Sequence, residues 1–154
     1  MVLLFLQNHA GCTFTKLRRK TLRFVAHESF LPLGSFCLHK TRGNSLSAQA
    51  RTLMEDPDNV LVFSAASLWE ITIKPGLGRA DFQIDPYLLR RGLIENGYEE
   101  LSITSQHALA VGRLPDVHRD PFDRILVAQA MVEGLLLLTH DPLVQAYPGP
   151  IEAV

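Results

Sequence analysis

Apolar and polar residues form blocks between residues 45 and 139, and these blocks predict strands and helices in alternation. Short apolar runs rich in β-branched residues predict buried strands, whereas longer runs with helical spacing predict helices. The predicted strands are NVLVFS, LSIT and LLLLT, at residues 59–64, 101–104 and 135–139. The predicted helices span residues 45–56, 65–74, 87–96, 105–114 and 121–133. This alternation is typical of an α/β fold with a mainly parallel sheet and right-handed crossovers.

The ends of the helices carry signals of their own. Ser45 or Ser47 is expected to cap the first helix, and Asp85, directly before a proline, to open the third. Gly97 and Gly134 are expected to end the third and the last helix.

Residues 1–44 show no comparable regularity. VLLFL (2–6) and LRFVA (22–26) are its candidate strands, and the remainder scatters Pro, Gly and Cys without a period. The chain is therefore divided into an atypical segment, residues 1–44, and a regular core, residues 45–154.

Composition places the chain among ordinary globular domains. Its 154 residues are 47% hydrophobic and 20% charged, which favours one domain with a real core over a disordered chain. No run of apolar residues is long enough to span a membrane, and the start lacks the basic region of a secretory signal. Cys12 and Cys37 match no zinc spacing and no disulfide framework, so a reducing cytoplasm is the expected location.

Charge is distributed unevenly along the chain. Residues 1–54 hold eight Lys or Arg and a single acid, Glu28, whereas residues 55–154 hold seven Lys or Arg and fifteen Asp or Glu. A basic front part can attract nucleic acid, and KLRRKTLR (16–23) is its densest run.

Two aspartates lie three residues apart at the start of the last predicted helix, in RDPFDRILVAQA (119–130). Asp120 precedes Pro121, which is a common way to begin a helix. Asp123 falls at the third helical position, where a carboxylate favours the positive end of the helix. Capping explains both acids, and metal binding is the alternative.

Two further acids lie near the ends of predicted strands. Glu70 follows NVLVFS on an apolar helix; Ser67 three residues earlier suggests a capping box, but a carboxylate in such surroundings needs a partner or a metal. Asp141 follows LLLLT directly, either as a turn aspartate or at the edge where parallel sheets bind ligands.

Taken together, these acids favour a metal site. Clustered carboxylates repel one another unless a cation intervenes, and an all-oxygen site suits Mg²⁺ or Mn²⁺ rather than zinc. Such an ion can activate water and stabilise charge on a phosphodiester. The histidines show no HExxH pairing, Ser64 sits in no GxSxG turn, and no Gly-rich phosphate loop is present.

The motifs SLSAQAR, SAASLWEITIK and LPDVHRDPFDRILVAQAMVEGLLLLTHDP, in this order, closely resemble the VapC-like PIN-domain toxins of bacterial toxin–antitoxin pairs, over about residues 45–154. The resemblance implies an α/β/α PIN sandwich and an endoribonuclease that depends on Mg²⁺ or Mn²⁺. It also implies an RNA substrate, an antitoxin protein as partner and a homodimer. By this resemblance Glu70, Asp123 and Asp141 hold the metal and carry catalysis, while Asp120 and Ser64 support the site.

The family's first strand ends in an aspartate, which this chain does not match. LFLQNHA (4–10) places Gln7 there, and FVAHESFL (24–31) offers Glu28 as a further supporting ligand. A reading-frame change upstream of about residue 44 or divergence with loss of activity would each explain this departure. The alternatives to a ribonuclease are an inactive PIN module that dimerises or binds an antitoxin, and a nucleic-acid binder led by residues 16–23.

Overall fold

The computed structural model describes residues 47–73, 85–139 and 141–153, and the backbone of three two-residue strands before them. Five described strands pair in parallel. The first group, in spatial order, is β1 (Arg23–Phe24), β4 (Val60–Ser64) and β5 (Glu99–Leu101); the second is β6 (Leu137–Thr139) with β7 (Ile151–Ala153). The strands β2 (Pro32–Leu33) and β3 (Phe36–Cys37) form an antiparallel pair. The predicted α/β fold with a mainly parallel sheet is confirmed.

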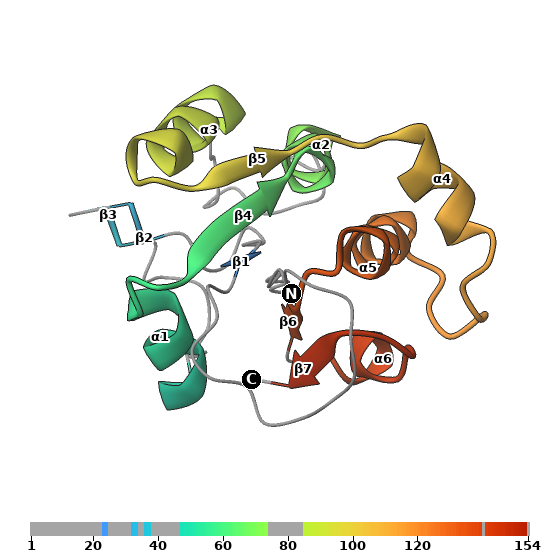
Figure 1. Cartoon of the computed structure of the whole chain (residues 1–154). Helices are drawn as coiled ribbons and strands as arrows, with labels where there is room; N and C mark the ends of the chain where they lie inside the picture. The colour runs from blue at the N-terminus through green and yellow to red at the C-terminus, as the bar shows by residue number, and fades with distance from the viewer. Residues whose placement is uncertain are drawn as a thin grey trace.

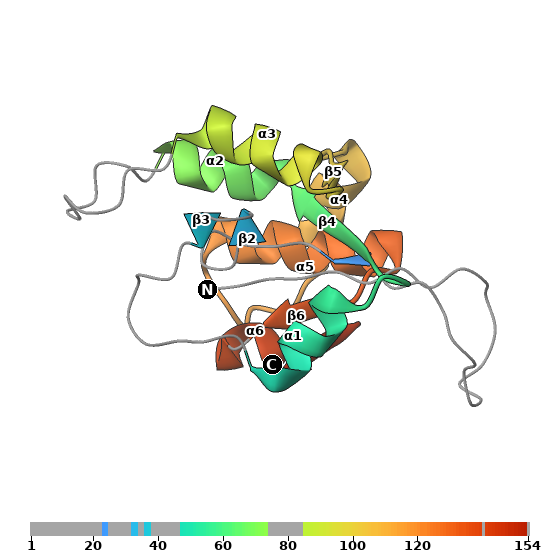
Figure 2. The same ribbon diagram turned by 90° about the vertical axis from the view of Figure 1, so that its left-hand side faces the viewer.

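Helices alternate with these strands along the described chain (Figure 1). They are α1 (Ala48–Glu55), α2 (Ala65–Ile73), α3 (Pro86–Glu95), α4 (Ser105–Val111), α5 (Pro121–Glu133) and α6 (Pro142–Gln145). In Figure 2, α2 and α3 lie together at the top, α5 runs through the middle, and α1 and α6 lie at the bottom. The central position of α5 explains why its side chains are among the most buried of the described residues.

The core forms around α5 and the strands on either side of it. Leu126, Val127 and Ala128 are fully buried, as are Phe63 on β4 and Leu137 on β6. Burying each of the Leu, Val and Phe side chains supplies roughly 1.5–3 kcal/mol, and this burial is the main force that holds helix and strands together.

Local signals place the helix ends as expected. Ser47 caps α1, and its Oγ accepts the N–H of Ala50 at 3.0 Å; the other candidate, Ser45, lies outside the described residues. Asp85 caps α3. Gly97 and Gly134 follow α3 and α5 with φ angles of 81° and 63°, a left-handed conformation that glycine adopts without strain.

The strand predicted at residues 101–104 is wrong in its position, because β5 covers Glu99–Leu101. Thr104 instead caps α4, where its Oγ1 accepts the N–H of His107 and its own N–H is donated to His107 Nδ1. The strand was hard to locate because Glu99 and Glu100 are exposed and give it no apolar signal.

Other boundaries differ by a few residues. The strand predicted at 135–139 is confirmed only for Leu137–Thr139, and the helix predicted at 105–114 ends at Val111. The candidate strand at 22–26 is confirmed at Arg23–Phe24, which pair in parallel with β4. The candidate strand at 2–6 lies outside the described residues. The helix α6 and the strands β2, β3 and β7 were not predicted.

Candidate active site

The first turn of α5 carries the two aspartates of the RDPFD motif. Asp120 is the N-cap, and its Oδ1 accepts the N–H of Phe122 at 2.8 Å. Asp123 lies in the first helical turn, as predicted, and is only 2% exposed. Capping explains the position of Asp120, whereas the burial of Asp123 requires compensating contacts, because a buried charge is costly unless it is paired.

His118 lies against both aspartates and was not identified from the sequence. Its Nδ1 accepts the N–H of Asp120 at 3.0 Å and lies 3.3 Å from Asp123 Oδ2. The available signal was position, two residues before an Asp-Pro helix start, rather than a metal-binding spacing.

Glu70 is buried on α2, with 4% of its surface exposed. The capping box predicted for Ser67 and Glu70 is wrong, because α2 begins at Ala65 and Ser67 lies inside the helix. Ser64 takes the capping role, since its Oγ accepts the N–H of Ala66 at 3.0 Å. The buried Ser67 hydroxyl has no hydrogen-bond partner among the described residues.

An aromatic contact brings the helices of Glu70 and Asp123 together. Trp69 on α2 and Phe122 on α5 meet edge to face, with ring centroids 5.0 Å apart and ring planes at 70°. Each ring belongs to the residue directly before one of the two buried acids. This is the geometry in which aromatic rings attract one another, so the pair holds the two acid-bearing segments side by side.

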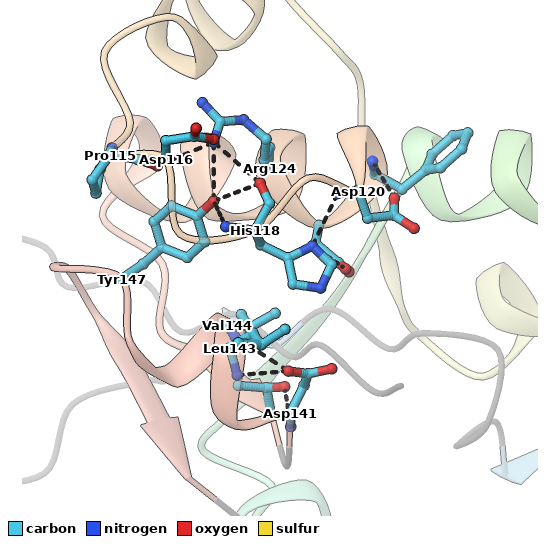
Figure 3. Close-up of polar contacts among 12 residues, drawn as sticks. Pro115, Asp116, His118, Asp120, Arg124, Asp141, Leu143, Val144 and Tyr147 are labelled. Carbon is cyan, nitrogen blue, oxygen red and sulfur yellow. Dashed lines mark hydrogen bonds and ion pairs between the residues drawn. The ribbon is translucent and has the colours of Figure 1, made fainter.

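Asp141 lies beyond the carboxyl end of β6 and caps α6. Its Oδ1 accepts the N–H of Leu143 at 2.7 Å, and its own N–H is donated to Thr139 Oγ1 at 3.0 Å. In Figure 3 the imidazole of His118 lies beside Asp120 and points toward the side of the view where Asp141 is drawn. Asp141 is partly exposed, in contrast to Glu70 and Asp123.

Ser64 is fully buried at the carboxyl end of β4. Its hydroxyl donates to Gln129 Oε1 at 2.6 Å, and Gln129 Nε2 donates to the carbonyl of Ser102 at 3.4 Å. A hydroxyl has one hydrogen to donate, so this bond to α5 uses the only one that Ser64 has. Gln129 was not identified from the sequence, and it ties β4, α5 and the segment after β5 together.

The donor chemistry of Glu70, Asp123 and Asp141 suits a hard divalent cation, because all three offer carboxylate oxygens. Within residues 47–73, 85–139 and 141–153, however, no three His, Cys, Asp or Glu side chains lie close enough together to hold a metal ion. Glu28 and Gln7, the residues predicted at or near the first-strand position, lie outside the described residues. The described part of the chain thus supplies candidate ligands but not a complete metal centre.

Comparison with known families identifies one match. The model of the PIN domain matches residues 35–149. No curated protein and no solved structure matches the chain. In the part that the structure describes, no helix is both long and apolar enough to cross a membrane. PIN domains are α/β/α proteins that are generally metal-dependent nucleases. Since the match covers well over half of the sequence and the fold agrees with it, the chain belongs to the PIN-domain family.

Proposed function

We propose that this chain is a VapC-like toxin ribonuclease, which hydrolyses phosphodiester bonds of RNA with the help of Mg²⁺ or Mn²⁺. The observation that carries the proposal is the pair of buried carboxylates, Glu70 and Asp123, on two helices in direct contact. Carboxylate oxygens are the ligands that a hard divalent cation takes in proteins, and two of them are brought together here. Glu70 also lies on the helix that directly follows the parallel strand β4, near the edge where α/β proteins bind ligands.

The proposed ligands are Glu70, Asp123 and Asp141, with Glu28 as a candidate fourth acid. A bound divalent ion would activate a water molecule and stabilise the charge that develops on the phosphate. Asp120 supports the site by holding the start of α5, since its carboxylate caps that helix. Ser64 supports it more remotely, through its hydrogen bond to Gln129 on the same helix.

The proposed setting is the cytoplasm, where a toxin of this kind meets its RNA. The proposed partners are an antitoxin protein and a second copy of the chain. These partners rest on the resemblance of the SLWEI and DPFDR motifs to VapC-like toxins. Co-expression with a candidate antitoxin, followed by co-purification and measurement of the mass of the complex, tests both.

The deciding experiment measures RNA cleavage with Mn²⁺ and with Mg²⁺ by three proteins: the unchanged chain, Asp123→Asn and Asp85→Asn. Asp85 is the control, because it is also an aspartate at the start of a helix that begins with an Asp-Pro pair, but it lies exposed at the N-cap of α3. We expect cleavage to fall at least about 100-fold in Asp123→Asn, because the position of the metal sets the geometry of attack. Asp85→Asn should cleave as the unchanged chain does, and equal activity of all three would overturn the proposal.

The second candidate is a PIN module that binds partners without cutting RNA. It is favoured by the lack of a three-ligand group among the residues with described positions, and by Gln7 at a place where the family has an aspartate. Calorimetry separates the two candidates. Binding of Mn²⁺ that is lost in Asp123→Asn supports the nuclease, whereas a folded chain with no affinity for Mn²⁺ or Mg²⁺ supports the module.

A further inference from the structure

The guanidinium of Arg124 forms hydrogen bonds with backbone carbonyls at the end of α4 and in the segment between α4 and α5. Its Nη2 donates to the carbonyls of Val111 and Leu114 at 3.1 and 3.3 Å. Its Nη1 donates to the carbonyls of Pro115 and His118 at 3.1 and 3.2 Å. Val111 is the last residue of α4, so the positive charge also lies at the negative end of that helix.

Tyr147, near the C-terminal end of the chain, forms hydrogen bonds with the same segment and with Arg124. It follows α6, is 4% exposed, and its hydroxyl oxygen accepts the N–H of His118 at 3.0 Å and Nη1 of Arg124 at 3.1 Å. The same hydroxyl donates to the carbonyl of His118 at 3.2 Å. Both backbone groups of His118 are thus held by one phenol, as Figure 3 shows.

These hydrogen bonds also fix where His118 lies relative to the aspartates of α5. With its backbone held, His118 presents Nδ1 to the N–H of Asp120 and lies 3.3 Å from the carboxylate of Asp123. Asp123 directly precedes Arg124 in α5, so one turn of helix carries both the carboxylate and the arginine that holds the loop beside it. Arg124 itself is only 17% exposed, which strengthens its hydrogen bonds relative to those of a solvated arginine.

We propose that Arg124 and Tyr147 are positioning residues, which place the imidazole of His118 against Asp120 and Asp123 and thereby prepare the candidate active site. They act through His118 and not on the substrate. Groups that orient metal ligands from behind commonly change metal affinity 10- to 100-fold when they are removed. This inference rests on the proposed function for its effect on metal binding, but the placement of His118 is testable without it.

Tyr147→Phe is the principal variant, and Tyr98→Phe is its matched control. Tyr98 is almost as buried, at 6% exposed, but its hydroxyl has no hydrogen-bond partner among the described residues. Both variants remove one buried hydroxyl, so a difference between them reports the bonds that Tyr147 makes. Arg124→Lys is the second variant, because one ammonium group cannot reach both sides of the loop that the planar guanidinium spans.

Two measurements are made on each folded protein at neutral pH. The first is the long-range ¹H–¹⁵N spectrum of the histidine rings, which reports the surroundings of both ring nitrogens of His118; its signals are identified by their loss in His118→Asn. The second is Mn²⁺ binding by calorimetry. In Tyr147→Phe we expect the Nδ1 signal of His118 to shift from its position in Tyr98→Phe, because the ring loses its fixed place beside the N–H of Asp120, and the Kd for Mn²⁺ to rise about 10-fold.

Each outcome decides a separate point. A His118 spectrum and a Kd that match those of Tyr98→Phe would overturn the inference, even if Tyr147→Phe lowered Tm, because Tyr147 would then be structural only. If the unchanged chain binds no Mn²⁺, the proposed nuclease fails, and the His118 spectrum alone judges the positioning role. If Tyr147→Phe does not fold, the same spectrum of Arg124→Lys decides it.

Discussion

The helices α3 and α5 begin alike but differ in which residues of their first turn are buried. Each starts with an Asp-Pro pair whose aspartate caps the first turn, with bonds of 2.8 Å to the N–H of Tyr87 in α3 and of Phe122 in α5. The third helical residue is Leu88 in α3, which is 63% exposed, and Asp123 in α5, which is 2% exposed. An apolar residue faces solvent where a charged one is buried, the reverse of what hydrophobicity alone would produce.

The difference shows that one local motif starts a helix in either setting, while the surroundings decide whether the third helical residue is buried or exposed. At α5 the aspartates meet His118, which Arg124 and Tyr147 hold in place. At α3 the capping aspartate is exposed. An Asp-Pro pair is therefore evidence for a helix start, and tertiary packing decides whether the side chain two residues after the proline is buried.

The largest predicted contrast lies in the bodies of the two helices. Leu126→Ala in α5 removes a side chain that is fully buried and should cost about 2–5 kcal/mol of unfolding free energy. Leu88→Ala in α3 removes an exposed side chain and should change stability by less than about 0.5 kcal/mol. Urea unfolding followed by circular dichroism measures both free energies of unfolding. A similar loss in the two variants would contradict the exposed position of Leu88.

A second contrast concerns the polar group buried beside α3. Burial raises the pKa of Tyr98 to about 12, from a usual value of 10. Above pH 10 the tyrosine ionises in the unfolded chain while it stays protonated in the folded one, so the unfolded state binds fewer protons and stability falls with pH. Between pH 10 and 12 the loss should approach roughly 3 kcal/mol.

Tyr98→Phe should remove this part of the alkaline loss, and at neutral pH it should be neutral or slightly stabilising because the hydroxyl has no partner among the described residues. Urea midpoints of the two proteins from pH 9 to pH 12 give the comparison. Parallel curves for both proteins would contradict the assignment of the shift to Tyr98.

The smallest predicted effects test the shared motif itself. Asp85→Ala should cost about 1 kcal/mol, because it removes the acceptor for the first-turn N–H groups, whereas Asp85→Asn should be near neutral since asparagine caps equally well. Asp120→Asn should likewise preserve the cap of α5. Thermal unfolding of the four variants Asp85→Ala, Asp85→Asn, Asp120→Ala and Asp120→Asn measures these effects. A large loss in Asp120→Asn alone would show that the charge of Asp120, and not its cap, stabilises α5.

Much of the fold follows from neighbouring residues. Ser47, Asp85 and Asp120 cap their helices by bonding N–H groups two or three residues ahead, and Gly134 ends α5 because a left-handed residue suits glycine. These interactions are complete within one turn of chain, so the sequence predicts them well. The position of β5 was predicted wrongly because this strand is fixed by its pairing with β4. In that pairing Glu99 lies opposite Val62, which is 37 residues earlier in the sequence.

The sequence by itself determined the helix starts and ends, the α/β class and the acids Glu70, Asp123 and Asp141 as candidates. Only the tertiary structure decided that Asp123 and Glu70 are buried on touching helices while Asp141 remains partly exposed. It also brought Tyr147 to His118, 29 residues away, and Gln129 to Ser64, 65 residues away. The physical reason is that capping bonds are local, whereas burial and long-range hydrogen bonds depend on how the whole chain packs, which no short stretch of sequence encodes.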